Sequence, residues 1–365
     1  MAVEGMGRRL LPSWFAIALA LPLNCQTVTC FSPLASLPAQ QRRSLHTATK
    51  MLVSPYATKP YPVGVAGTSW GLDDRKAWLA RQVNQRSYAE EVLAKIEALK
   101  TSSVFTCEQY GELSVDPARY PLFVFKSREW DAAKPTCLVT GGVHGYETSG
   151  VQGALLFLQT EAAGYVPRFN LVVAPCVSPW GYEHIQRWNN NADDPNRNFK
   201  AGGPCDESNA LLKLVGDLRA SGVAFTAHVD LHETTDSDET EFRPAKSARD
   251  GEAYEQDSIP DGFYLVGDSE NPQPEWHSAM IESVRKVTHI APPDDKGLII
   301  GEKPVGDGCI VYPIASLSLC ASLTGAAYCT TTEVYPDSPS ADADICNKAQ
   351  VACVVGALDY ILQKQ

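Results

Sequence analysis

Three features are missing from this sequence of 365 residues: a Cys-x-x-Cys pair, an internal repeat and an apolar run long enough to cross a bilayer. Because the 11 cysteines are odd in number and scattered, they argue against a disulfide framework and predict buried, reduced thiols. The apolar run over residues 10–23 is broken by Pro12 and Pro22, and it falls short of the roughly 20 residues that a spanning helix needs. We therefore expect no stable membrane span.

Acidic residues are almost absent from the N-terminal region, where none follows Glu4 until Asp73. A segment that is poor in acids, contains Arg and Ser and precedes an acidic body is typical of a targeting leader. We expect a leader or transit segment over residues 1–51 and a single folded domain over residues 52–365. Organellar import, into the mitochondrion, is favoured over a cytoplasmic location that would follow from initiation at Met51, and secretion is favoured least.

Positive charge is also in deficit over the whole chain. There are 31 Lys and Arg against 43 Asp and Glu, which gives a formal net charge of -12 at pH 7. This balance argues against nucleic acid or an anionic membrane surface as the main partner. Hydrophobic residues make up 44% of the chain, enough for the core of one large domain.

What the sequence does contain is an alternation of apolar strands with helices, which predicts an α/β fold. We expect a mixed, mostly parallel sheet flanked by helices on both faces, with the functional site at the carboxyl ends of the strands. The predicted strands cover residues 120–125, 136–140, 171–176, 225–231, 262–266 and 327–335, with a hairpin over 297–312. Helical spacing of apolar residues occurs over 73–100, 151–160, 208–220, 275–287 and 347–362.

The first chemical motif is Gly141-Gly142-Val-His144-Gly-Tyr-Glu147, which follows the predicted strand over 136–140 and opens a helix. Two side chains three residues apart can converge on one ion when the first lies in the loop and the second in the first helical turn. Zinc accepts imidazole nitrogen and carboxylate oxygen, and catalytic sites keep one position for water. His144 and Glu147 are therefore candidate metal ligands, although a His-x-x-Glu spacing alone has little specificity.

A third ligand is expected at the end of another strand, and the segment Ala-His228-Val-Asp230-Leu-His232 supplies it. Residues 228, 230 and 232 point to the same side of a strand, but only His232 lies at its carboxyl end. We therefore choose His232 as the ligand and expect His228 to be packed or hydrogen-bonded within the sheet. Asp230 fits two roles equally well, that of a partner to the ligand and that of an ordinary buried carboxylate.

Four motifs then occur in a recognisable order: Gly-Gly-Val-His144-Gly-Tyr-Glu147, the segment from Arg187 to Asn196-Arg197-Asn-Phe, Asp-Leu-His232 and Thr-Thr-Glu333. In this order the sequence resembles zinc metallocarboxypeptidases of the carboxypeptidase A type, and among them the short bacterial-type members without an inhibitory prodomain. The resemblance runs from about Tyr61 to the C-terminus. It implies a carboxypeptidase-like fold, one zinc ion and hydrolysis of the C-terminal bond of a peptide substrate.

The resemblance also assigns roles to individual residues. His144, Glu147 and His232 match the zinc ligands, and Glu333 matches the carboxylate that acts as general base and then acid. Arg187 matches the arginine that stabilises the oxyanion. The expected substrate-binding residues are Asn196, Arg197 and Tyr312: the first two match the pair that grips the terminal carboxylate, and Tyr312 lies near the position of the tyrosine that closes over the substrate.

A second function stays open on the same scaffold. The segment Asp230-Leu-His232-Glu-Thr-Thr also resembles that of aspartoacylases and succinylglutamate desuccinylases, which hydrolyse small N-acyl amino acids. The segment that begins at Arg187 and ends in Asn198-Phe199 favours the peptidase. The expected partner is thus a peptide or a small acylated amino acid, and the sequence leaves the oligomeric state open.

Overall fold

A computed structural model describes residues 61–364, so the leader predicted over residues 1–51 lies outside the described residues. Eight strands form one sheet in the order β1-β2-β4-β3-β5-β8-β6-β7. The central strands β4, β3, β5 and β8 are mutually parallel. Strand β2 pairs antiparallel with β4, and β6 pairs antiparallel with β8. The bounds are β1 Phe105–Glu112, β2 Pro121–Ser127, β3 Thr136–Gly141, β4 Asn170–Ala174, β5 Phe225–Glu233, β6 Tyr264–Asp268, β7 Cys309–Tyr312 and β8 Tyr328–Val334.

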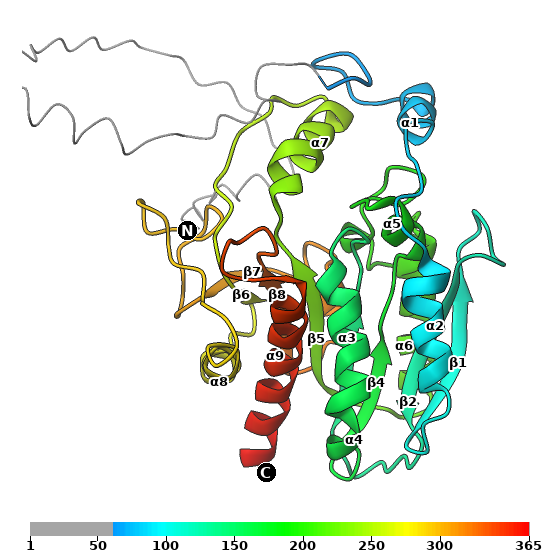
Figure 1. Cartoon of the computed structure of the whole chain (residues 1–365), viewed down its shortest axis with the longest axis vertical. Helices are drawn as coiled ribbons and strands as arrows, with labels where there is room; N and C mark the ends of the chain where they lie inside the picture. The colour runs from blue at the N-terminus through cyan, green and yellow to red at the C-terminus, as the bar shows by residue number, and fades with distance from the viewer. Residues whose placement is uncertain (1–60, 365) are drawn as a thin grey trace, which may run out of the picture.

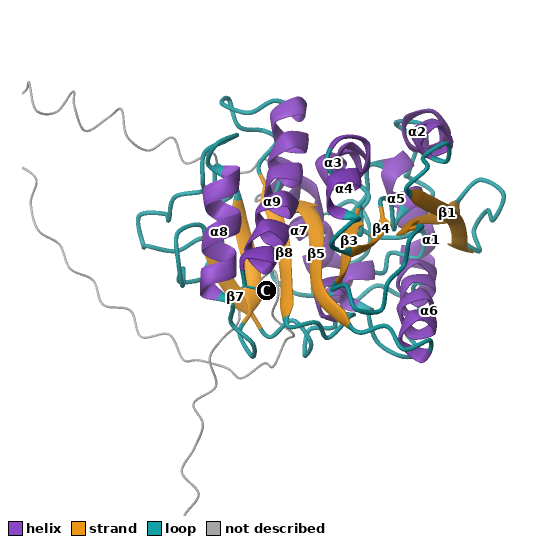
Figure 2. Ribbon diagram, turned by 90° about the horizontal axis from the view of Figure 1, so that it is seen from below, coloured by secondary structure: helices purple, strands orange, loops and turns teal. Residues whose placement is uncertain are grey.

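Helices cover both faces of this sheet, as Figures 1 and 2 show. Helices α2, α3, α8 and α9 lie over one face, and α6 lies over the other. The predicted mixed, mostly parallel sheet with helices on both faces is confirmed. The helices are α1 Leu72–Leu79, α2 Ala94–Leu99, α3 Thr148–Thr160, α4 Ala162–Tyr165, α5 Pro179–His184, α6 Asp206–Ala220, α7 Arg243–Asp250, α8 Pro274–Val284 and α9 Ala343–Gln363.

The central strands are buried along their whole length because both faces of the sheet are covered. Every residue of β3 and β4 is buried, and their sequences are accordingly almost continuous runs of apolar residues. The core on one face joins these strands to α3, α8 and α9, and the core on the other face includes Leu211, Leu214 and Val215 of α6. This packing holds the carboxyl ends of β3, β5 and β8 side by side.

Helix α9 is the one helix within residues 61–364 that is long and apolar enough to cross a membrane by length and composition. Half of its most apolar window is buried inside the protein, against α3 and α8. Its apolar character is thus in large part that of a core helix, because its buried side chains form one continuous set with the sheet.

Two parts of the sheet differ from the sequence prediction. Strand β1 has a largely polar sequence, and we did not expect it; it is an edge strand that pairs with β2 alone. The hairpin predicted over residues 297–312 is wrong, because only β7 is a strand there and it runs parallel to β6. The nine cysteines of the described chain are free, and eight of them are buried, as the sequence predicts.

Candidate metal centre and active site

The turn between β3 and α3 brings two of the predicted ligands together. Gly142 has a φ of +64°, a conformation that side chains with a Cβ rarely adopt. Gly145 touches the backbone of Gly181, and a Cβ at this position would overlap it. The chain can therefore turn tightly from Gly142 to Glu147, which places the side chains of His144 and Glu147 at the N-terminus of α3.

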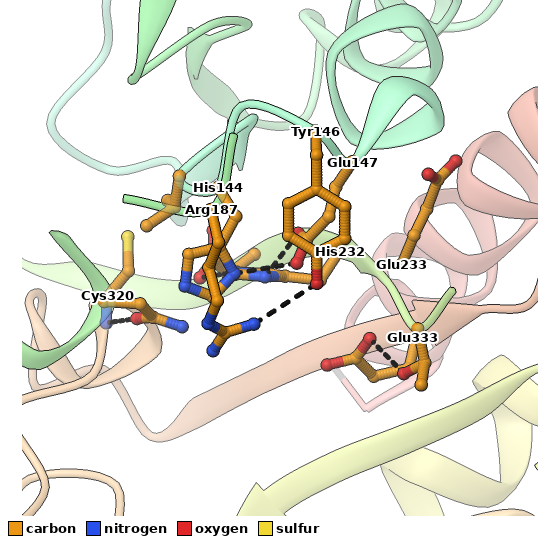
Figure 3. A network of polar contacts seen from close by, with 12 residues as sticks. His144, Tyr146, Glu147, Arg187, His232, Glu233, Cys320 and Glu333 are labelled. Carbon is orange, nitrogen blue, oxygen red and sulfur yellow. Dashed lines mark hydrogen bonds and ion pairs between the residues drawn. The ribbon is translucent and has the colours of Figure 1, made fainter. Parts of the chain in front are cut away.

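The third predicted ligand, His232, completes the group at the carboxyl end of β5 (Figure 3). The donor atoms of His144, Glu147 and His232 all lie within 4.8 Å of one another. The Nδ1 atom of His144 lies 2.7 Å from one oxygen of Glu147, and the Nδ1 atom of His232 lies 2.7 Å from the other. All three side chains are buried, with exposed fractions of 1–2%.

The second nitrogen of each imidazole is held by an aspartate. Nε2 of His144 lies 3.0 Å from Asp194, and Nε2 of His232 lies 2.8 Å from Asp230. Each Nε2–H donates to a carboxylate, which fixes the ring orientation and leaves Nδ1 facing the shared centre. Of the two roles that the sequence left open for Asp230, the structure favours that of a partner to His232.

The donor set fits one divalent ion of the zinc type. Two imidazole nitrogens and a carboxylate oxygen are donors that zinc takes in catalytic sites, at about 2.0–2.2 Å. The two imidazoles outweigh the effect of burial and lower the pKa of Glu147 to about 2, so this side chain is a carboxylate at every physiological pH. The structure thus supplies a buried, anionic and pre-oriented group at the position where the sequence predicts a metal.

A second group of potential ligands, His228, Asp230 and Cys320, lies deeper in the sheet. Its centre is filled by the hydroxyl of Thr140, which lies 2.9 Å from His228, 2.6 Å from Asp230 and 3.7 Å from the Cys320 sulfur. A hydroxyl with these contacts leaves no room for an ion. We interpret the group as a hydrogen-bond network behind Asp230, and His228 is a hydrogen-bonded sheet histidine, as expected.

Glu333 lies on β8 directly opposite His232 on β5. One oxygen of its carboxylate accepts a hydrogen bond of 2.8 Å from the hydroxyl of Thr234, as Figure 3 shows. Burial, and after it the neighbouring Glu147 carboxylate, raise the pKa of Glu333 to about 8. A divalent cation beside Glu147 would lower this pKa again, because it cancels the repulsion between the two carboxylates.

Arg187 is held from two directions by acidic groups. Its Nε lies 3.2 Å from Asp194, and its Nη1 donates to the hydroxyl of Tyr146 at 3.2 Å (Figure 3). Tyr146 in turn donates to the buried Asp238 at 2.5 Å, and Asp238 lies 3.7 Å from Nη1. The guanidinium is thereby fixed in the wall of the cavity that contains His144 and His232.

Asn196 and Arg197 line the same cavity, from the short 3-10 helix η2 (Pro195–Arg197). The side-chain oxygen of Asn196 accepts from the backbone N–H of Cys320 at 2.7 Å, which orients the amide. Burial lowers the pKa of Arg197 to about 10, a cost that a bound carboxylate would offset. Tyr312 is buried in β7 and is not among the residues that line this cavity, so its contact with substrate stays a prediction.

Three residues that build the site were not predicted for it. Asp194 holds both His144 and Arg187, whereas Tyr146 and Asp238 hold Arg187. Asp194 stands two residues before Asn196, and Tyr146 stands between His144 and Glu147. Their closeness in sequence to predicted site residues could therefore have identified them. Asp238 lies in an acidic stretch over residues 236–241 in which the sequence gives no means of choosing one member.

The fold of this protein is similar to that of known proteins, whereas its chemistry has to be inferred from the residues of the site. A family model described as a protein of unknown function (DUF2817) matches residues 129–213. This segment holds His144, Glu147, Arg187 and Arg197. No curated protein matches the sequence.

Solved structures match over most of the chain. A provisionally assigned metallopeptidase from Shewanella denitrificans is 19% identical, with a TM-score of 0.55, and the match covers 73% of this chain and 88% of that one. A metallo-carboxypeptidase from Burkholderia cenocepacia is 14% identical, with a TM-score of 0.53 and coverages of 76% and 69%. Carboxypeptidase A from Helicoverpa armigera is 14% identical, with a TM-score of 0.50 and coverages of 75% and 74%. The protein therefore has the fold of the metallopeptidases and carboxypeptidases to which it is similar.

Proposed function

We propose that this protein is a zinc-dependent metallocarboxypeptidase that hydrolyses the C-terminal peptide bond of its substrate. The observation that carries the proposal is that three kinds of functional side chain line one cavity. Two imidazoles of the metal group, the arginine pair Arg187 and Arg197, and the carboxylate of Glu333 all line it. The similarity of the fold to metallo-carboxypeptidases supports the same reading.

His144, Glu147 and His232 would hold the zinc ion. When bound there, zinc acts as a Lewis acid that polarises the scissile carbonyl and makes water more acidic. The remaining chemistry belongs to side chains of this chain. Glu333 accepts a proton from the attacking water and delivers it to the leaving nitrogen, a role that requires a carboxylate beside the ligands.

The two arginines bind different parts of the substrate. Arg187 places positive charge where the carbonyl oxygen becomes an anion, and Asp194 and Tyr146 keep the guanidinium in position before the substrate arrives. Arg197 offers a planar, two-pronged donor to the terminal carboxylate, beside the amide of Asn196. These roles together account for cleavage next to a free carboxyl terminus.

A small N-acyl amino acid is the second candidate substrate, and the size of the cavity favours it. The cavity opens to solvent, and the part of it that water-sized molecules can occupy is about 30 Å³, room for roughly one or two of them. Its wall includes Tyr264 and Ile300, so a large side chain enters only if these residues move. The same observation favours a small residue at the C-terminus of a peptide.

Paired substrates decide between the two candidates. The zinc-loaded protein is incubated with short peptides that end in a free carboxylate, with the same peptides amidated at the C-terminus, and with N-acetyl-aspartate. We expect release of the last residue from the free peptides alone. Turnover of N-acetyl-aspartate without turnover of any peptide would show that the protein is a deacylase and not a peptidase. Equal cleavage of amidated peptides would exclude recognition of the terminal carboxylate by Arg197 and Asn196.

A further inference from the structure

Helix α3 begins directly after a candidate metal ligand, and this deprives the helix of an ordinary N-cap. Glu147 occupies the N-cap position, but its side chain makes no cap hydrogen bond, because its two oxygens face His144 and His232. The first backbone N–H groups of a helix have no partner within the helix, and a buried N–H without a partner costs free energy. The start of α3 therefore needs an acceptor from another element.

Glu233, the residue after His232 on β5, supplies this acceptor. One oxygen of its carboxylate accepts from the backbone N–H of Thr148 at 3.0 Å, and the other accepts from that of Ser149 at 2.7 Å. Glu233 is 4% exposed. A carboxylate at the N-terminus of a helix is also favoured by the helix dipole. One buried side chain thus joins the neighbours of two candidate ligands, Glu147 and His232.

A second contact to the same corner of the molecule comes from the C-terminal helix. Gln350 of α9 is fully buried, although the other buried residues of this helix are apolar residues, cysteines or a glycine. Its Nε2 donates to the backbone carbonyl of His232 at 2.7 Å and to the hydroxyl of Ser149 at 3.3 Å. Its Oε1 accepts from the hydroxyl of Thr332 at 2.6 Å. The amide thus connects β5, the start of α3 and the residue of β8 that precedes Glu333.

The packing of α9 on α3 leaves room for this amide and for nothing more. A Cβ at Gly153 of α3 would lie 2.6 Å from the Cβ of Gln350, a distance at which two carbon atoms overlap. A buried amide costs free energy unless it is hydrogen-bonded, and an apolar side chain of the same size would fill the space without that requirement. Every hydrogen bond of this amide leads to an element that carries a ligand or Glu333, and a satisfied buried network holds such elements rigidly.

We propose that Glu233 and Gln350 are positioning residues of the metal centre, which fix Glu147 at the start of α3 relative to His232 on β5. The proposal rests on the metal site of the proposed function, and it makes the C-terminal helix a part of that site. Neither residue is a ligand, because each acts through the backbone beside one. Loss of either set of contacts should let α3 shift against β5 and weaken metal binding in a chain that is still folded.

Zinc affinity tests this proposal when it is measured by competition with a chelator at a temperature at which the variants are folded. Glu233→Gln keeps one acceptor in place of two, and Gln350→Met keeps the approximate volume of the side chain but loses its three hydrogen bonds. We expect each substitution to weaken zinc binding about tenfold or more, the usual effect of losing a group that orients a ligand. Circular dichroism establishes that each variant is folded.

Val354→Ala is the matched control, because it removes buried packing from the same helix and none of these hydrogen bonds. It should lower the melting temperature and leave the zinc affinity unchanged. A merely structural role of Gln350 would give that same pattern for Gln350→Met. Unchanged zinc affinity in a folded variant would overturn the role of the substituted residue, and Glu233→Gln decides alone if Gln350→Met does not fold. Absence of zinc from the unsubstituted protein would appear separately and would overturn the metal site itself.

Discussion

His144 and His232 present the same ring nitrogen, Nδ1, to the two oxygens of one carboxylate, that of Glu147, each at 2.7 Å. The two rings lie nearly perpendicular, with centroids 4.9 Å apart. Because aspartates hold both Nε2 atoms, the two Nδ1 atoms and the carboxylate share a single focus. The proposed hydrolytic function requires an ion at this focus.

Loss of any one of these three residues should abolish stable zinc binding. If the proposed zinc site is correct, the zinc content of His144→Ala, Glu147→Ala and His232→Ala falls from about one ion per chain toward zero after dialysis, since these three residues would hold the ion. His289→Ala is the control, because His289 pairs with Asp261 near the surface. Elemental analysis of the purified variants gives the answer, and full zinc content in His232→Ala would place the metal elsewhere.

Asp194 should control zinc affinity although it is not a ligand. Its carboxylate accepts from Nε2 of His144 and also contacts Arg187. Asp194→Asn is expected to weaken zinc binding about 10–100-fold, the usual cost of losing such a partner, as measured by competition with a chelator. Asp193→Asn serves as the control because its carboxylate pairs with Arg75 instead. The same affinity in both variants would contradict the role of Asp194.

Glu333→Gln should remove turnover and leave the metal in place. The amide keeps the size of the side chain but cannot accept a proton, so we expect a loss of at least about 100-fold in kcat. Glu270→Gln, an exposed residue beyond β6, should retain full activity. Zinc content and kcat are measured on the same samples. Activity of the Glu333→Gln variant near that of the unsubstituted protein would show that Glu333 does not transfer the proton.

The pH dependence of stability should carry a contribution from Glu207. This residue of α6 is 1% exposed, and burial raises its pKa from 4.5 to about 7. The folded state therefore binds the proton more tightly than the unfolded state, and stability falls as pH rises from 4.5 to 7. The loss is up to roughly 3 kcal/mol, from about 1.4 kcal/mol per pH unit.

Glu207→Gln removes this dependence, so the variant should unfold at a higher urea concentration than the natural sequence at pH 8 and at nearly the same concentration at pH 4.5. Asp217→Asn on the same helix is exposed and should show no such divergence. A constant difference between the Glu207→Gln variant and the natural sequence across the pH range would show that Glu207 has an ordinary pKa.

The sequence allowed the centre of the fold to be predicted because burial on both faces leaves a simple pattern. Strands β3 and β4 are largely apolar runs, and β5 carries an apolar residue at every second position. His144 follows β3, and His232 lies at the end of β5. Strand β1 could not be found in this way, since an edge strand with polar residues has no such run. The region before β7 was misjudged because short apolar segments between glycines also occur in irregular loops.

Within the site, the convergence of His144, Glu147 and His232 was predictable, and most of the contacts that orient these side chains were not. His232 could be chosen over His228 because the end of a strand is defined by its pattern. The contact between Asp194 and His144 joins residues 50 positions apart, and that between Asp238 and Tyr146 joins residues 92 apart. Such contacts depend on the packing of loops, for which local sequence carries no periodic signal.

The most direct test of the account is mass spectrometry of a peptide library after incubation with the zinc-loaded protein, with and without a chelator. We predict products that are shorter by one C-terminal residue, enriched in peptides with a small last residue, lost with the chelator and restored by added zinc. Internal cleavage, shortening from the N-terminus, or unchanged cleavage in the chelator would contradict a zinc-dependent carboxypeptidase.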